Sequence, residues 1–125
     1  MDHLTYLASL RRRYDLGNWP RRQFGSDAQW AHLNRALEVI RLRSHFPMFG
    51  TTEVQDVVNT VLGGGTLSEK QLYTDRRYIR RLTDTFSDLE RLPKPPAVTS
   101  RQHARMLSIL SKRRAYQDKQ TSPRV

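Results

Sequence analysis

Four arginines lie close together in the middle of the sequence, and their spacing places them on one side of a helix. They are Arg76, Arg77, Arg80 and Arg81. At 100° per residue they occupy an arc of about 140°. Guanidinium groups make paired hydrogen bonds with phosphate oxygens and with the acceptor edge of guanine. The arrangement therefore predicts a basic surface that contacts nucleic acid, with Thr74 and Tyr78 at its edge.

The other reactive side chains form no recognisable catalytic or metal-binding pattern. The chain has no cysteine, which excludes a thiolate nucleophile, a disulfide framework and cysteine-ligated zinc. The histidines are scattered, and none pairs with another at ligand spacing; they are His3, His32, His45 and His103. The glycines at 63–65 lack the Gly-Lys-Ser/Thr of a phosphate loop. We therefore expect no enzyme activity, no metal and no cofactor. The histidines are expected at the surface or at helix caps. The carboxylates are expected on helix surfaces, where they pair with arginines.

The net charge of +10 is distributed unevenly over the 125 residues. Residues 1–25 carry five basic and two acidic residues, which gives a net charge of +3. Residues 26–96 carry ten basic and nine acidic residues, which gives +1. Residues 97–125 carry seven basic residues and one acidic residue, or +6. Such an imbalance favours a polyanionic partner, first nucleic acid, then an acidic protein surface, then an anionic membrane. Phosphate contacts are predicted at Arg11, Arg12, Arg13, Lys112, Arg113 and Arg114.

A helix is predicted to end at the glycines of residues 63–65, which disfavour a helix interior and suit a C-cap. Its apolar residues recur with the 3.6-residue period of one helix face. They are Val54, Val57, Val58, Val61 and Leu62. Thr52 and Gln55 have the spacing of a capping box at its start.

The arginines belong to a second, longer helix, predicted from Thr74 as its N-cap to about Leu92. Its apolar residues occupy an arc of about 80°, almost opposite the arginines. They are Ile79, Leu82, Phe86 and Leu89. A helix with an apolar back and a basic front, following a shorter helix and a turn, has the layout of a helix-turn-helix DNA reader. The alternative is an ordinary core helix whose basic side is only solvated.

Further helices are predicted at residues 2–14, 26–43 and 100–116, the last capped by Ser100. The helix at 26–43 has a wide apolar stripe, which predicts that neighbours cover it on more than one side. A short apolar turn at 44–51 should dock it against the valine-rich helix. The proline-rich segment 93–98 is expected to be a stiff spacer. These elements predict an all-α domain of about five helices over residues 1–116, followed by a disordered basic tail at 117–125.

The segment from Thr52 to Leu92, which contains TEVQDVVNTVL and TDRRYIRRLTDTF, resembles bacterial or phage helix-turn-helix and winged-helix transcription regulators. The resemblance covers about a third of the chain. It implies a small DNA-binding regulator in which a Glu- and Val-rich helix precedes an Arg-rich recognition helix. The segment between the two helices is longer than the usual turn of three or four residues, and no strand pair for a wing is predicted.

These patterns favour a nucleic-acid-binding protein with duplex DNA as its partner and RNA as the alternative nucleic acid. A second interpretation is a non-enzymatic helical adaptor, such as a ribonucleoprotein subunit or a small virus-encoded inhibitor. Its basic ends would bind RNA or an acidic protein. No apolar run approaches the length of a membrane span, so we expect no membrane partner and an intracellular location, in the cytoplasm or on the nucleoid. The oligomeric state stays open.

Overall fold

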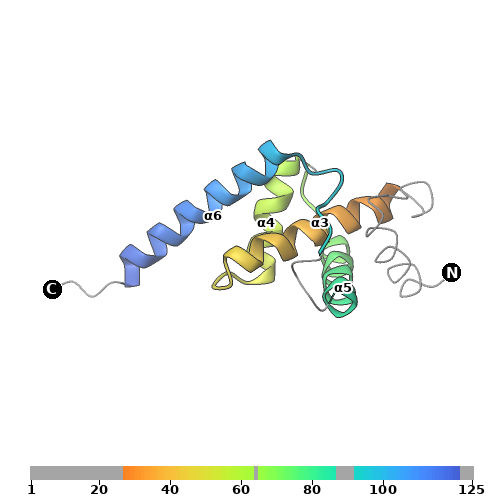
Figure 1. Cartoon of the computed structure of the whole chain (residues 1–125), viewed down its shortest axis with the longest axis horizontal. Helices are drawn as coiled ribbons and strands as arrows, with labels where there is room; N and C mark the ends of the chain where they lie inside the picture. Colours follow the sequence, from red (N-terminus) through yellow and green to blue (C-terminus); the bar gives the residue numbers. More distant parts are fainter. Residues whose placement is uncertain (1–26, 64, 87–91, 122–125) are drawn as a thin grey trace.

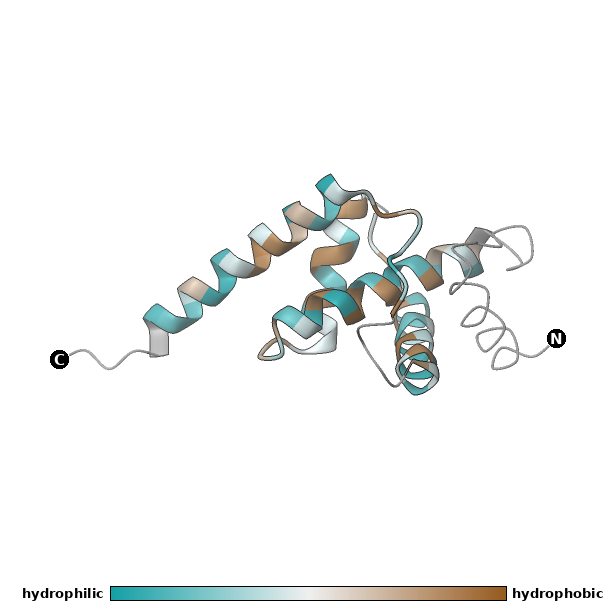
Figure 2. Ribbon diagram, in the orientation of Figure 1, coloured by the Kyte–Doolittle hydropathy of each residue, from teal (hydrophilic) through white to brown (hydrophobic). Residues whose placement is uncertain are grey.

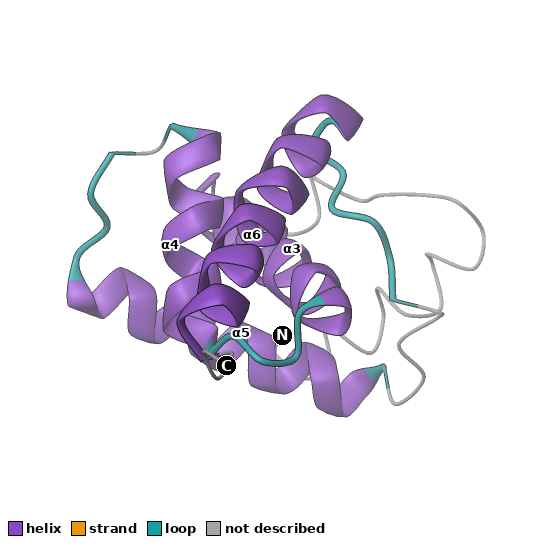
Figure 3. Cartoon of the chain, turned by 90° about the vertical axis from the view of Figure 1, so that its left-hand side faces the viewer, coloured by secondary structure: helices purple, strands orange, loops and turns teal. Residues whose placement is uncertain are grey.

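The structure is a computed structural model, and it describes residues 27–63, 65–86 and 92–121. These residues form four helices and no strand (Figure 3). The helices are α3 (Asp27–His45), α4 (Thr51–Leu62), α5 (Glu69–Thr85) and α6 (Ser100–Thr121). Figure 1 shows α3 between α5 on one side and α4 and α6 on the other. The all-α prediction is confirmed for this part of the chain, and the predicted helix at 2–14 lies outside the described residues.

Helix α3 is the centre of the core because it is apolar on two sides. Leu33 and Leu37 are buried in the cluster that joins α3 to α5. Val39 and Leu42 are buried in a second cluster with residues of α4 and α6. The predicted covering of this helix on more than one side is therefore confirmed. Figure 2 shows the hydrophobic residues gathered where the helices meet.

The link between α3 and α4 is short and apolar, as predicted. Phe46 and Phe49 are buried, and their ring centroids lie 5.9 Å apart. Helix α4 begins at Thr51 with Gly50 as its N-cap and without a side-chain capping bond. The predicted capping box of Thr52 and Gln55 is therefore wrong. Gln55 is buried instead, and its Nε2 donates to the carbonyl of Leu72 over 3.1 Å, which ties α4 to the start of α5.

Gly63 ends α4, in agreement with the predicted glycine stop. Its backbone lies in the left-handed region, with φ 69° and ψ 24°. Its N–H donates to the carbonyl of Asn59 over 3.1 Å. No atom lies within 4 Å of the position that a Cβ would take. A residue with a Cβ is therefore disfavoured here by the left-handed backbone conformation, and not by a clash with neighbouring atoms.

Replacing Gly63 by Ala is expected to lower the free energy of unfolding by about 1–2 kcal/mol, because a non-glycine residue in the left-handed region pays that penalty. Gly50→Ala is the matched control, since Gly50 has φ −73° and also has open space around it. It should lose less stability than Gly63→Ala, because its φ suits any L residue and no side-chain capping bond is lost. Urea denaturation measures both variants, and equal losses would contradict a backbone origin of the effect.

Helix α5 begins six residues earlier than predicted and ends sooner. Ser68 is the N-cap, in a capping box with Gln71, so the predicted cap at Thr74 is wrong. Thr74 lies inside the helix, where its hydroxyl donates to the carbonyl of Lys70 over 2.9 Å. The helix starts at Ser68 because the capping box satisfies two of the orphan amides there. It ends at Thr85 rather than near residue 92, and Phe86 follows as the C-cap.

The predicted apolar stripe of α5 is partly confirmed. Leu82 and Phe86 are buried in the cluster with α3, and Ile79 packs against that cluster while partly buried. Leu89 lies outside the described residues.

Two buried carboxylates attach α5 and α6 to α3. Asp75 on α5 is 2% exposed, and its Oδ2 accepts from Nε of Arg35 over 2.7 Å, while His32 pairs with its other oxygen. Glu38 on α3 is fully buried and pairs with His103 of α6. The expected surface location of carboxylates and histidines is therefore wrong for these groups. Burial is tolerated because each carboxylate has a cationic or hydrogen-bonding partner.

The proline-rich segment packs on α3 instead of spanning open space. Pro93 and Pro95 are buried, and the N–H of Ala97 donates to the side chain of Asn34 over 2.7 Å. Asn34 is itself buried, which fixes the path of the chain toward α6.

Helix α6 begins at Ser100, but the capping residue is the one before it. Thr99 and Gln102 form reciprocal hydrogen bonds of 2.9 and 3.1 Å, so the predicted cap at Ser100 is wrong. The helix runs to Thr121, beyond the predicted end near residue 116. Its C-terminal part extends away from the other helices (Figure 1). This exposed part contains Gln and Lys, which are good helix formers even without tertiary contacts.

Candidate nucleic-acid interface

The arginines of α5 form one face of the helix, which is centred on the side away from α3 and borders α3 at Arg77 and Arg81. Arg76, Arg77 and Arg80 are exposed, and Arg81 is half-buried. The buried residues of α5 are Asp75, Tyr78 and Leu82. They centre on the side of the helix opposite the arginines, as the 100° rotation per residue requires. We call the solvent side, with Lys70, Tyr73, Arg76, Arg77, Arg80 and Arg81, the α5 outer face.

Tyr73 belongs to this face, although it and Lys70 lie before the predicted start of the helix. Its side chain is 58% exposed. It precedes Arg76, Arg77 and Arg80 by three, four and seven residues, so it lies in the middle of their arc. The predicted helix began at Thr74 and left Tyr73 in a loop. The capping-box spacing of Ser68 and Gln71 is the sequence signal that could have extended the helix over it.

Tyr78, predicted at the exposed edge of the arginines, is buried instead. It is 3% exposed, and its ring centroid lies 5.5 Å from that of His32. Burial raises the pKa of Tyr78 to about 12, while the charge of Arg81 lowers it and that of Asp75 raises it. The phenol is therefore protonated at neutral pH. The reason for its burial is its rotation toward Leu82, one turn further along the inner side of the helix.

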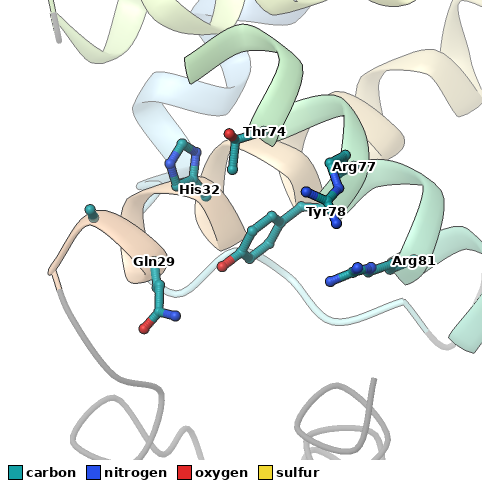
Figure 4. Close-up of a pocket in the computed structure, with 7 residues that line it drawn as sticks. Gln29, His32, Thr74, Arg77, Tyr78 and Arg81 are labelled. Atoms are coloured by element: carbon teal, nitrogen blue, oxygen red, sulfur yellow. The ribbon is translucent and has the colours of Figure 1, made fainter. Parts of the chain in front are cut away.

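A pocket of about 320 Å³ lies between the first half of α3 and the middle of α5 (Figure 4). Its lining residues are Ala28, Gln29, His32, Thr74, Arg77, Tyr78 and Arg81. In Figure 4 the Tyr78 ring and the Arg81 side chain extend from α5 toward the side where Gln29 and His32 lie. The pocket therefore combines two cationic side chains with several hydrogen-bonding groups.

The wall of this pocket is held by the buried ion pair between α3 and α5. Arg35 donates to both oxygens of Asp75, over 2.7 and 3.1 Å. His32 pairs through Nδ1 with the same carboxylate, so a hydrogen bond from its ring to a ligand would involve Nε2. This arrangement fixes the orientation of His32 and the distance between the two helices at the pocket.

Helix α6 carries a second basic surface, which we call the α6 stripe. It consists of four exposed side chains, Arg101, Arg105, Lys112 and Lys119. They occupy an arc of about 40° and extend over about 27 Å of helix. The buried residues of α6, Met106 and Leu110, lie on the other side of the helix. The stripe therefore faces solvent along nearly the whole helix.

The three phosphate contacts predicted near the end of α6 do not share one face. Lys112 belongs to the α6 stripe, and Arg114 is exposed on another side of the helix. Arg113 faces α4, where its guanidinium lies 3.7 Å from Glu53 Oε1 and 3.8 Å from Asp56 Oδ2. These exposed pairs contribute at most about 1 kcal/mol, but they turn Arg113 away from a ligand on the stripe.

The other predicted phosphate contacts, at Arg11, Arg12 and Arg13, lie outside the described residues. Among residues 27–63, 65–86 and 92–121, no group of three or more His, Cys, Asp or Glu side chains could hold a metal ion. No helix within those ranges is long and apolar enough to cross a membrane.

Comparisons with protein-family models, with curated proteins and with solved structures gave no match to this chain.

Proposed function

We propose that the chain is a non-enzymatic nucleic-acid-binding protein and that the α5 outer face is its contact surface. The observation that carries the proposal is the exposed Tyr73, which lies about one helical turn before Arg76 and Arg77 and in line with Arg80. Guanidinium groups bind phosphate and base edges, and an exposed aromatic ring adds a stacking or phosphate-bonding group. A solvated helix face has no need of a large exposed aromatic ring beside its arginines.

Duplex DNA is the nucleic acid that we propose as the ligand. Helix α5 has 17 residues and is therefore about 25 Å long. A single helix of this kind fits the major groove, where arginine makes paired bonds to guanine. In this proposal the protein is a small intracellular regulator, and α4 and α5 act as a helix-turn-helix pair. Support comes from the packing of both helices on α3 and from the bond of Gln55 to Leu72, which connects them.

The α6 stripe adds sequence-independent phosphate contacts in this proposal. Lys112→Gln should reduce the slope of log affinity against log salt by about one, which is the value of one lost phosphate contact. Arg113→Gln removes the same charge from the adjacent residue but should leave the slope nearly unchanged, because Arg113 faces Glu53 and Asp56. Fluorescence anisotropy over a salt series measures both slopes. Equal slopes for the two variants would remove the stripe from the interface.

A selection experiment tests the proposed function. The chain is mixed with a pool of random duplexes, and bound molecules are sequenced after several rounds. We expect a preferred site that contains guanine, because the arginines of α5 read its acceptor edge. Parallel titrations use a random duplex, a single strand and a structured RNA. No selected site, together with tighter binding of RNA or of an acidic protein, would replace the DNA-binding proposal by the adaptor interpretation.

A further inference from the structure

We propose that the pocket between α3 and α5 is a binding site for one phosphate group. The pocket is lined by Arg77 and Arg81 from α5 and by Gln29 and His32 from α3 (Figure 4). That the phosphate belongs to a nucleic acid rests on the proposed function. The site itself rests on the lining of the pocket, which shares Arg77 and Arg81 with the α5 outer face but does not include Arg76 and Arg80.

The two arginines give the pocket its positive charge. Arg77 and Arg81 are one helical turn apart, so their Cα atoms are about 6 Å apart along the axis, and both side chains can reach one anion. Within the described part of the chain, neither forms an ion pair with a carboxylate. The nearest buried acid, Asp75, already receives two hydrogen bonds from Arg35. The charge of the pocket is therefore available to a ligand.

The polar groups around the arginines suit a phosphate as well. Gln29 and Tyr78 also belong to the lining and make its wall polar, whereas the hydroxyl of Thr74 donates to the carbonyl of Lys70. Ala28 and Gln29 lie in the first turn of α3, at the positive end of the helix dipole. The volume of about 320 Å³ is at the lower end of the range for small-molecule sites, so a phosphate with part of its sugar can enter.

Titration with inorganic phosphate, followed by NMR of the backbone amides and of the His32 ring, tests the site. We expect saturable shifts at the lining residues in the wild-type chain. In Arg77→Gln/Arg81→Gln the affinity for phosphate should fall at least about tenfold, the effect of 1.4 kcal/mol. Arg76→Gln/Arg80→Gln is the matched control, with the same helix and the same charge change but outside the pocket. It should keep the wild-type affinity for inorganic phosphate, while it is expected to weaken the binding of nucleic acid to the α5 outer face.

Two results would overturn the proposal. One is the absence of saturable shifts in the wild-type chain, and the other is an equal loss in both double variants, which would indicate a general charge effect. Both variants should fold, because Gln is a good helix former and none of the four arginines is buried. A melting curve of each variant verifies this before the titrations.

The source of the phosphate is distinguished with two oligonucleotides of the same sequence, one with a 5′-phosphate and one with a 5′-hydroxyl. Tighter binding of the first, lost in Arg77→Gln/Arg81→Gln, identifies a terminal phosphate. If the two oligonucleotides bind equally well and Arg77→Gln/Arg81→Gln weakens their binding more than Arg76→Gln/Arg80→Gln does, the bound phosphate lies within the strand. Equal weakening of both oligonucleotides by the two variants would reject the pocket as a nucleic-acid contact.

The site and the proposed function can fail separately. Saturable binding of inorganic phosphate without binding of any nucleic acid would retain the site and reject the function. Nucleic-acid binding that depends equally on Arg77/Arg81 and on Arg76/Arg80 would retain the function and reject the site.

Discussion

Replacing Asp75 by Asn is expected to lower the free energy of unfolding by about 3 kcal/mol. The substitution keeps the shape of the side chain but removes the charge that compensates Arg35. Breaking a buried ion pair from one side costs about 3–5 kcal/mol, because the other charge stays in the interior. The lower end of this range applies because the Arg35 side chain is 15% exposed and can reach some water. Chemical denaturation with urea measures the loss.

Asp84→Asn is the matched control for this prediction. Asp84 belongs to the same helix but is exposed, so its substitution should change the stability by no more than about 0.5 kcal/mol. An Asp75→Asn variant as stable as the control would mean that the ion pair does not hold α5 on α3.

Replacing the four arginines of α5 by Gln is expected to reduce affinity for a random duplex by about three orders of magnitude near 0.1 M salt. Each phosphate contact changes the logarithm of affinity by about 0.9 for every tenfold change in salt. Four contacts together change the logarithm by about 3.6, so they are worth at least about 10³-fold at 0.1 M relative to 1 M salt. The variant carries Gln at Arg76, Arg77, Arg80 and Arg81. Fluorescence anisotropy against salt concentration measures both the affinity and its slope.

A variant with Lys at the same four positions separates the effect of the positive charge from the effect of the planar guanidinium geometry. It keeps the net charge of +10, whereas the Gln variant lowers it to +6. Lysine preserves the attraction to phosphate but cannot make the planar paired bonds of a guanidinium. The Lys variant should therefore bind random duplex nearly as well as the wild type and lose its preference for a selected site. A loss of random-duplex affinity as large as that of the Gln variant would contradict phosphate attraction as the source of the effect.

Within the described residues, apolar periodicity was sufficient to predict that the four helices exist and which residues of α3 and α4 are buried. The stripes of α3 and α4 are local patterns, so Leu33, Leu37, Val54 and Val58 could be assigned to the core from their spacing alone. The glycine stop at Gly63 is also a local signal. The helix face that carries the arginines was predictable for the same reason.

The buried charges were not predictable, because each depends on a partner far away in the sequence. Asp75 is 40 residues from Arg35, and Glu38 is 65 residues from His103. Nothing in the local sequence around these residues distinguishes them from surface groups. Once α3 passes between the other helices, its polar residues face α5 and α6 and need partners there.

The start of α5 depends on a choice between competing capping residues. Ser68 and Thr74 are both residues of a type that can cap a helix, and the predicted cap is Thr74. The reciprocal bonds of Ser68 with Gln71 decide for the earlier start. Because Tyr73 lies between the two caps, this choice determines whether the arginines surround an aromatic ring.

NMR titration of the full chain with a random duplex tests most directly whether the α5 outer face is the contact surface. Its mass of 14.7 kDa is suitable for the measurement. We predict that the largest shifts of backbone amides and arginine Nε–H groups at saturation occur within α5, centred on Tyr73, Arg76 and Arg80. Smaller shifts should follow the α6 stripe. Saturable binding that leaves the signals of α5 unchanged would contradict the account.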